Sequence, residues 1–98
     1  MDGMITVTVA LNAIGADAKA TLDELMDGLG LKTTLPRTEG GVLNLPPGTY
    51  GRIIQIEDQM EQLKHYYRSL VDVMRKLNIK GKYFINLSQS PAYVCGEL

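Results

Sequence analysis

Side chains that could contact a ligand gather around the stretch NLPPGTYGRIIQ, residues 44–55. Tyr50 offers an aromatic ring and a hydroxyl, and Arg52 offers a guanidinium. Because side chains two residues apart share a face of a strand, we expect both on one face. A preceding segment that should pair with this strand adds the positive charges of Lys32 and Arg37. An aromatic ring among basic side chains suits single-stranded nucleic acid or an acidic protein surface. These four residues are therefore the candidates for binding a partner.

The glycines of this stretch do not form the pattern of a phosphate-binding loop. Such a loop places its glycines before the N-terminus of a helix, where free backbone N–H groups face the anion. Gly48 and Gly51 lead into a predicted strand instead, and no Lys-Ser or Lys-Thr pair follows them. Two interpretations stay open: a contact surface for a partner, or a structural strand in which Arg52 and Lys32 only solvate an open sheet face.

The remaining polar residues indicate neither a known catalytic centre nor a metal site. His65 is the single histidine and lies on the polar face of a predicted helix, so it is a weaker candidate for partner binding or proton transfer. A catalytic metal requires two or more converging carboxylates. We expect Asp17 to cap a helix and Asp23, Glu24 and Asp27 to lie on its surface. The catalytic residues are unknown, and we predict no metal and no cofactor.

The composition favours one small domain that covers residues 1–98. The chain has 98 residues, of which 45% are hydrophobic and 21% charged, and a net charge of −1, which argues against coating nucleic acid by charge alone. The lone Cys95 has no disulfide partner, and neither a signal peptide nor a membrane span is visible. We expect a cytoplasmic protein. Because a domain of this size buries little surface, we also expect a homodimer.

The first half of the chain predicts strands around one helix. Residues 5–11 alternate between apolar and polar side chains, which is typical of a strand with one buried face. Residues 17–30 place leucines and a methionine at helical spacing and end at Gly28 and Gly30, with Thr21 and Glu24 as an alternative capping box. Residues 31–35 alternate again. Gly40 and Gly41 suit a hairpin turn, and the main third strand should cover residues 49–54, after two prolines.

The second half predicts a long helix and a final strand. From Ile56 the apolar residues recur every three or four positions, flanked by Tyr66 and Val73, which is typical of an amphipathic helix. Residues 82–88 predict a fourth strand, and residues 89–98 form a tail that could cover or extend a sheet edge. The predicted stripe is Ile56, Met60, Leu63, Tyr67, Leu70, Met74 and Leu77.

The order strand, helix, strand, strand, helix, strand predicts a fold of the α+β class. Crossover connections between strands of one sheet are right-handed. Two such split crossovers produce the ferredoxin-like βαββαβ sandwich, a four-stranded antiparallel sheet with two helices on one face. Each predicted helix has a single apolar stripe, which fits two layers.

Certain segments resemble a family of small proteins. The strand ITVTVALN, the helix LDELMDGLGL, the segment KTTL and the stretch LNLPPGTYGRI resemble the GhoS-like endoribonuclease antitoxins of type V toxin–antitoxin systems. This resemblance implies a ferredoxin-like fold, shared with small CRISPR-adaptation nucleases, and a tendency to dimerise. Those nucleases have an aspartate at the end of the first strand, where this chain has Asn12, which cannot carry a metal-binding charge.

We therefore predict a small dimeric interaction protein without enzymatic activity, which binds a protein or a single-stranded RNA partner as an antitoxin or inhibitor would. The alternative is a sequence-preferring endoribonuclease of the antitoxin type that cleaves a specific mRNA. It would use Arg37 or Arg52 to stabilise the transition state and Tyr50 or His65 to transfer protons.

Overall fold

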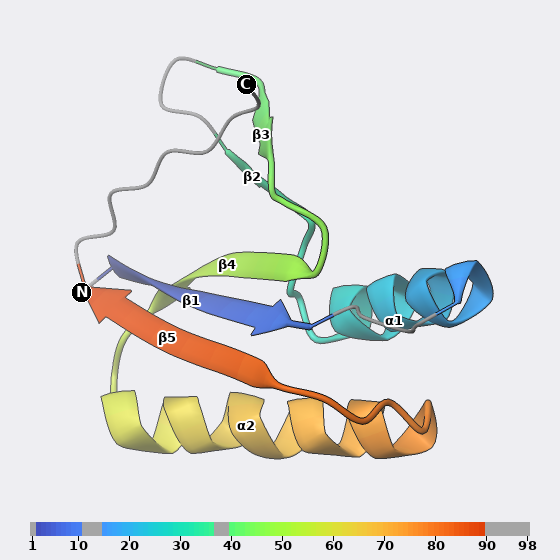
Figure 1. Cartoon of the computed structure of the whole chain (residues 1–98). Helices are drawn as coiled ribbons and strands as arrows, with labels where there is room; N and C mark the ends of the chain where they lie inside the picture. Colours follow the sequence, from blue (N-terminus) through green and yellow to red (C-terminus); the bar gives the residue numbers. More distant parts are fainter. Residues whose placement is uncertain (1, 11–14, 37–39, 90–98) are drawn as a thin grey trace.

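The chain folds into two helices and five strands, and it belongs to the α+β class (Figure 1). The structure is a computed structural model that describes residues 2–10, 15–36 and 40–89. The strands are β1 (Asp2–Val9), β2 (Thr34–Pro36), β3 (Val42–Asn44), β4 (Thr49–Gln55) and β5 (Tyr83–Gln89), and the helices are α1 (Ala16–Gly28) and α2 (Gln59–Lys76).

The main sheet has three antiparallel strands in the order β4-β1-β5, and both helices pack on one face of it (Figure 1). Strands β2 and β3 form a separate two-stranded hairpin. The prediction of four strands in one sheet is therefore wrong in this respect. What remains of the fourth strand is a single antiparallel bridge, in which Lys32 and Gly51 exchange both backbone hydrogen bonds at 2.9 Å.

The residues before β4 explain why the bridge does not grow into a strand pair. Continuing its register would pair residues 34–36 with residues 47–49. Pro47 has no N–H to donate, and Gly48 has a φ of +82°, so neither can join a ladder. Pro46, Pro47, Gly48 and Thr49 instead form a turn closed by the Thr49 N–H on the Pro46 carbonyl at 3.0 Å. Segment 34–36 then pairs with β3, and the predicted turn at Gly40 and Gly41, both with positive φ, joins the two strands.

Helix α1 begins differently from the capping prediction but ends as predicted. Its N-cap is Gly15, which makes no side-chain cap, and Asp17 lies in the first turn. The predicted capping box does not form, because the Thr21 hydroxyl donates to the Asp17 carbonyl instead. The predicted stop is confirmed: Gly30 has a φ of +78°, and its N–H and that of Leu31 donate to carbonyls of the last turn.

Helix α2 begins at an N-cap, Asp58, whose carboxylate accepts the Glu61 N–H at 3.1 Å. Its buried face is rotated from the predicted stripe. Tyr66 and Val73, expected to flank the stripe, are buried, whereas Met60 and Tyr67 are 60% and 46% exposed. The sheet ends at β5, so nothing in the described part of the chain covers the outer side of α2.

The core lies between the sheet and the helices. On β1, Ile5, Val7 and Val9 face the helices, as the alternation predicts, although the strand starts at Asp2 rather than Ile5. The final strand is confirmed as β5, which includes Gln89; the rest of the predicted tail and Leu11 lie outside the described residues. The other buried core residues are Leu22, Met26, Leu31, Tyr50, Tyr66, Leu70, Val73, Met74 and Leu87.

Candidate functional site

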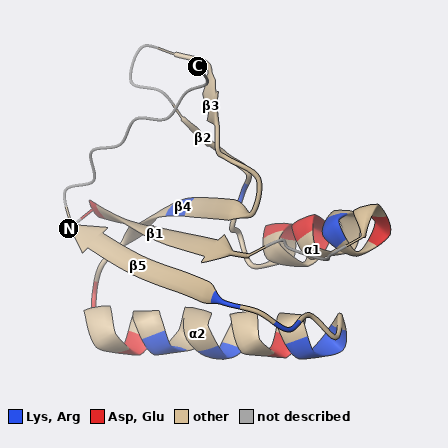
Figure 2. Ribbon diagram, viewed as in Figure 1, with Lys and Arg blue, Asp and Glu red and all other residues tan. Residues whose placement is uncertain are grey.

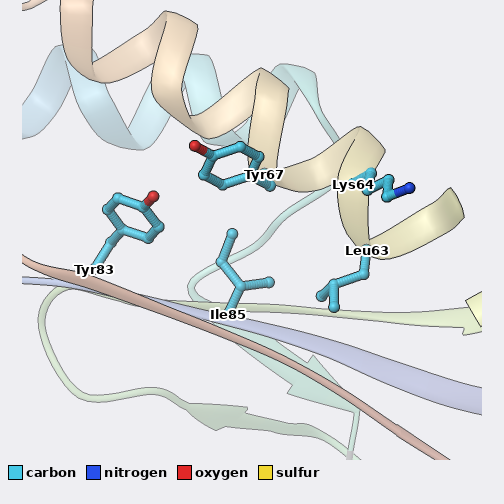
Figure 3. A pocket seen from close by; sticks show the side chains of 5 residues that line it. All are labelled: Leu63, Lys64, Tyr67, Tyr83 and Ile85. Atoms are coloured by element: carbon cyan, nitrogen blue, oxygen red, sulfur yellow. The ribbon is translucent and has the colours of Figure 1, made fainter. Parts of the chain in front are cut away.

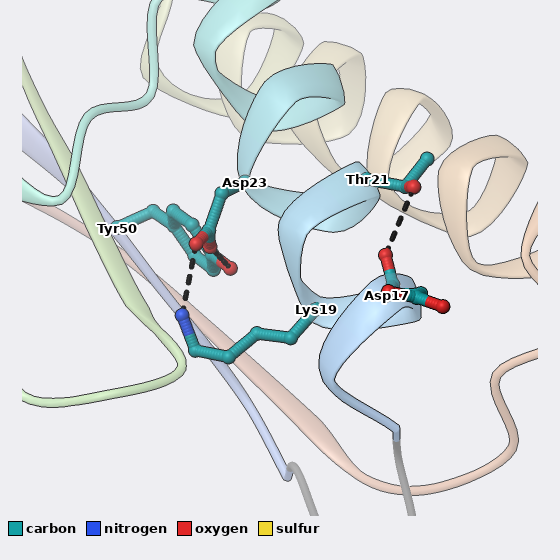
Figure 4. Close-up of polar contacts among 5 residues, drawn as sticks. All are labelled: Asp17, Lys19, Thr21, Asp23 and Tyr50. Carbon is teal, nitrogen blue, oxygen red and sulfur yellow. Dashed lines mark hydrogen bonds and ion pairs between the residues drawn. The ribbon is translucent and has the colours of Figure 1, made fainter.

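Tyr50 lies inside the protein and connects the sheet to α1 (Figure 4). Its ring is fully buried, and its hydroxyl donates to Asp23 Oδ1 at 2.5 Å. The second carboxylate oxygen of Asp23 accepts from Lys19 Nζ at 2.8 Å. The three side chains fasten α1 to β4. The Tyr50 ring presents no surface on which a base could stack.

This contact shifts the pKa of both acids. Burial, together with the neighbouring Asp23 carboxylate, raises the pKa of the Tyr50 hydroxyl well above its ordinary value. Burial also acts to raise the pKa of Asp23, but the hydrogen bonds from Lys19 and Tyr50 outweigh it, so the pKa of Asp23 lies below its ordinary value. The tyrosine therefore stays protonated and the aspartate charged at neutral pH.

Arg52 reaches from β4 to both helices. Its Nη1 donates to the Tyr66 hydroxyl at 2.9 Å and to the Leu29 carbonyl, at the C-terminus of α1, at 3.3 Å. Arg52 and Tyr50 thus share the helix-facing side of β4, as predicted. Next to Tyr66, the exposed His65 ring makes an edge contact with the Tyr66 ring at 5.2 Å between centroids. The structure therefore brings Arg52 and His65 near one another through Tyr66.

Lys32 lies elsewhere, beside the acidic side of α1. Its ammonium pairs with the Asp27 carboxylate, and both residues line a surface hollow of about 420 Å³ together with Asp23. Arg37 lies outside the described residues. The three described basic and aromatic candidates therefore do not form one surface patch, and that they bind a partner stays a prediction.

A different feature, which sequence reasoning did not identify, is an apolar groove between α2 and β5 (Figure 3). It holds about 370 Å³. The rings of Tyr67 and Tyr83 face one another across it at 6.0 Å between centroids, tilted by 42°. Both rings are exposed, Tyr83 to 39%. The sequence did contain an indication of this groove. The predicted apolar stripe of the helix has more residues than one helix face can bury, so some of them had to lie at the surface. The lining residues are Leu63, Lys64, Tyr67, Tyr83 and Ile85.

The groove runs beside the outer edge of β5, which pairs with no strand in the described part of the chain. The Ala10 N–H donates to the Lys82 carbonyl at 2.9 Å, and bonded and non-bonded pairs alternate along an antiparallel ladder. Tyr83, Ile85 and Leu87 therefore direct their backbone groups away from β1. In agreement, the Gln59 side chain donates to the outward Leu87 carbonyl at 3.2 Å.

Acidic residues gather at one end of this edge and basic residues at the other, with Lys64, Arg68 and Asp72 between them along α2. Helix α2 runs antiparallel to β5, since its first residue, Gln59, contacts the end of the strand and its middle contacts the start. The acidic end combines Glu57, Asp58 and Glu61. The basic end combines Arg75, Lys76, Lys80 and Lys82, where α2 ends and β5 begins (Figure 2).

Metal and membrane features do not add to the site. Among the described residues, no group of three or more His, Cys, Asp or Glu side chains could hold a metal ion. None of the helices in the described ranges is long and apolar enough to cross a membrane. Comparison with known protein families, with curated proteins and with solved structures finds no match for this chain.

Proposed function

We propose that this protein acts by association rather than catalysis, as a homodimeric binding protein whose dimer forms along β5. The observation that carries the proposal is the outer edge of β5 beside the apolar groove. Natural edge strands are usually protected from pairing by charges, prolines or bulges. The seven residues of β5, YFINLSQ, contain no charge and no proline. Such an edge is a template for another strand.

Several features favour a second copy as the occupant. Two β5 strands that pair antiparallel about a two-fold axis present the same surface to each other. The acidic end of one copy then faces the basic end of the other, which supports this orientation. The overhanging side chains of α2, Met60 and Tyr67, would be covered by the partner copy. The pairing would extend the sheet from three strands to six.

In this proposal the dimer is a regulator that binds a further protein or a single-stranded RNA, in the manner of an antitoxin or an inhibitor. Two of the predicted contact residues, Arg52 and Lys32, have partners within the chain, which favours an interaction surface elsewhere. The resemblance to GhoS-like proteins and the cytoplasmic location stay predictions.

Oligomeric state measured by light scattering or sedimentation tests the proposal. We expect the wild-type protein to have twice the chain mass of 10.8 kDa. Tyr67→Lys and Tyr83→Lys place a charge on either side of the groove and should each raise the dimer dissociation constant about tenfold or more. Val42→Lys, at a still more exposed apolar residue of the hairpin, should leave the dissociation constant unchanged. A wild-type monomer, or a dimer unaffected by both groove variants, would exclude this interface.

The alternative, an endoribonuclease, is favoured by one specific observation. Arg52, Tyr66 and His65 bring a guanidinium, a phenol and an imidazole together, and these groups can stabilise a phosphorane and transfer protons. Incubation with a mixed RNA pool decides between the two. Cleavage that His65→Ala and Arg52→Ala abolish, while Arg68→Ala retains it, would replace the binding proposal by this one. Intact RNA at high protein concentration would exclude the enzyme.

A further inference from the structure

The face of the sheet opposite the helices carries an exposed aromatic side chain, Phe84, that neither the core nor the proposed β5 interface requires. Because Tyr83, Ile85 and Leu87 face the helices, Phe84 and Asn86 face the other way. The ring of Phe84 is 66% exposed, the most of any large apolar side chain in the described ranges. The register sets three rows on this face: Phe84, Thr8 and Thr49; Asn86, Thr6 and Gly51; Ser88, Met4 and Ile53.

One part of this face is already covered, and the Phe84 row is not. Leu35 of the hairpin packs over Gly51, where an added Cβ would lie 3.1 Å from its methyl carbon, and Leu35 is itself buried. Thr8, which pairs with Phe84 on β1, is exposed. An exposed aromatic ring therefore lies on a sheet surface whose neighbours are threonine hydroxyls and an amide.

Positive charge borders the same end of the sheet. The bond between Ala10 and Lys82 continues the ladder through Lys82, so Lys82 shares the face of Phe84, and Lys80 precedes it in the turn. No acidic residue occurs between Val73 and Gln89. None of the ion pairs found in the described part of the chain involves these two lysines.

Among the described residues of this face, the carboxylate is that of Asp2, and it is remote from the ring. Asp2 lies at the opposite end of β1, where Gln55 donates a hydrogen bond to it. Thr8 lies six positions after Asp2, which corresponds to about 20 Å along a strand. Among the described residues, the charge around Phe84 is therefore positive, although the whole chain carries −1.

We propose that Phe84 and Lys82 form a binding site for single-stranded nucleic acid on the open face of the sheet. A base stacks on the Phe84 ring, because every base has an apolar π-face and stacking needs no particular sequence. Lys82 and Lys80 contact the phosphates, and the Thr8 hydroxyl and Asn86 amide are within the same surface to hydrogen-bond base edges. The Phe84 ring lies on the opposite face from the groove, so base stacking does not require the proposed dimer, although Lys80 and Lys82 also belong to the basic end of the β5 edge.

Fluorescence anisotropy with a labelled oligonucleotide of about eight nucleotides, within the usual range of site sizes, tests this site. An RNA and a DNA of the same mixed sequence are compared; equal affinity indicates recognition of bases and phosphates alone, and tighter RNA binding indicates use of the 2′-hydroxyl. Phe84→Ala should weaken binding about fivefold or more. Lys82→Ala should reduce the slope of log affinity against log salt by about 0.7.

Two control variants separate this site from general charge attraction and from the dimer. Arg68→Ala removes an exposed cation of α2 on the other side of the molecule and should change the affinity less than about twofold, the change we take as no effect. Tyr67→Lys should dissociate the dimer without weakening binding of the short oligonucleotide, since Phe84, Lys82 and Lys80 stay in place. Two results would overturn the site: no binding by the wild-type protein at about 50 mM salt, or equal losses in Phe84→Ala and Arg68→Ala.

Discussion

Replacement of Tyr50 by phenylalanine tests the contact that fastens α1 to the sheet. The substitution keeps the buried ring and removes only the hydroxyl that donates to Asp23 at 2.5 Å. Asp23 keeps the hydrogen bond from Lys19, and its side chain is 32% exposed, so water can replace part of the lost interaction.

The expected loss follows from these contacts. A hydrogen bond to a charged group contributes about 1.5–3 kcal/mol, and partial access of water to Asp23 reduces the cost of losing it. We therefore expect Tyr50→Phe to lower the free energy of unfolding by about 1–2 kcal/mol. For a domain of this size, that corresponds to a fall in Tm of roughly 5–15 °C.

Urea unfolding followed by circular dichroism measures this loss, with the midpoint and slope fitted separately so that a change in compactness is recognised. Thr8→Val is the control, because it removes the hydroxyl of an exposed threonine on β1, outside the α1 contact and the groove, and should change the free energy of unfolding by less than about 0.5 kcal/mol. If Tyr50→Phe is as stable as Thr8→Val, the contact with Asp23 does not stabilise the fold, and our account of α1 is wrong.

Two further predictions concern the same region. Because the folded pKa of Asp23 lies below its ordinary value of 3.8, its stabilisation is complete above that pH and disappears as the pH falls through the folded value; Asp23→Asn should flatten the acid limb of a stability–pH curve measured by urea unfolding. The pKa of Tyr50 is raised, so its contribution is complete below pH 10.0 and disappears as the pH rises through the folded value; Tyr50→Phe should flatten the alkaline limb. Gly30→Ala should lower the free energy of unfolding by about 1–2 kcal/mol, since φ is +78° and the new Cβ would lie 3.0 Å from the Arg52 guanidinium; Gly28→Ala, with open space around it, is the control, and equal stability of the two variants would show that α1 does not need a glycine there.

Much of the fold could be predicted from local patterns. The alternation of Ile5, Val7 and Val9 and the helical spacing of α1 and α2 depend on residues that are neighbours in sequence. The pairing of strands was harder to predict, because it depends on residues of the neighbouring strand that are distant in sequence. Pro46 and Pro47 were recognised as unsuited to a ladder, yet the effect of this segment on β2, which loses its place beside β4, appears only when the register and the positive φ of Gly48 are known.

In the candidate site, too, features set by local sequence could be predicted and features set by long-range packing could not. The shared face of Tyr50 and Arg52 follows from strand period and was predicted. Their engagement by Asp23 and Tyr66 depends on how two helices pack against the sheet, which one sequence does not reveal. The groove could not be recognised from the sequence, because the apolar residues of α2 extend over more than one face of the helix and the pattern does not show which of them are buried. Only the position of the last strand shows that Tyr67 overhangs the sheet instead of entering the core.

Amide hydrogen exchange, resolved by residue with NMR at low and high protein concentration, tests the proposed β5 interface most directly. The N–H groups of Phe84 and Asn86 face β1 and should exchange slowly at both concentrations. Those of Tyr83 and Ile85 point outward, so we predict that they exchange rapidly in dilute solution and become protected as the dimer forms. Rapid exchange of Tyr83 and Ile85 at every concentration would contradict pairing along β5.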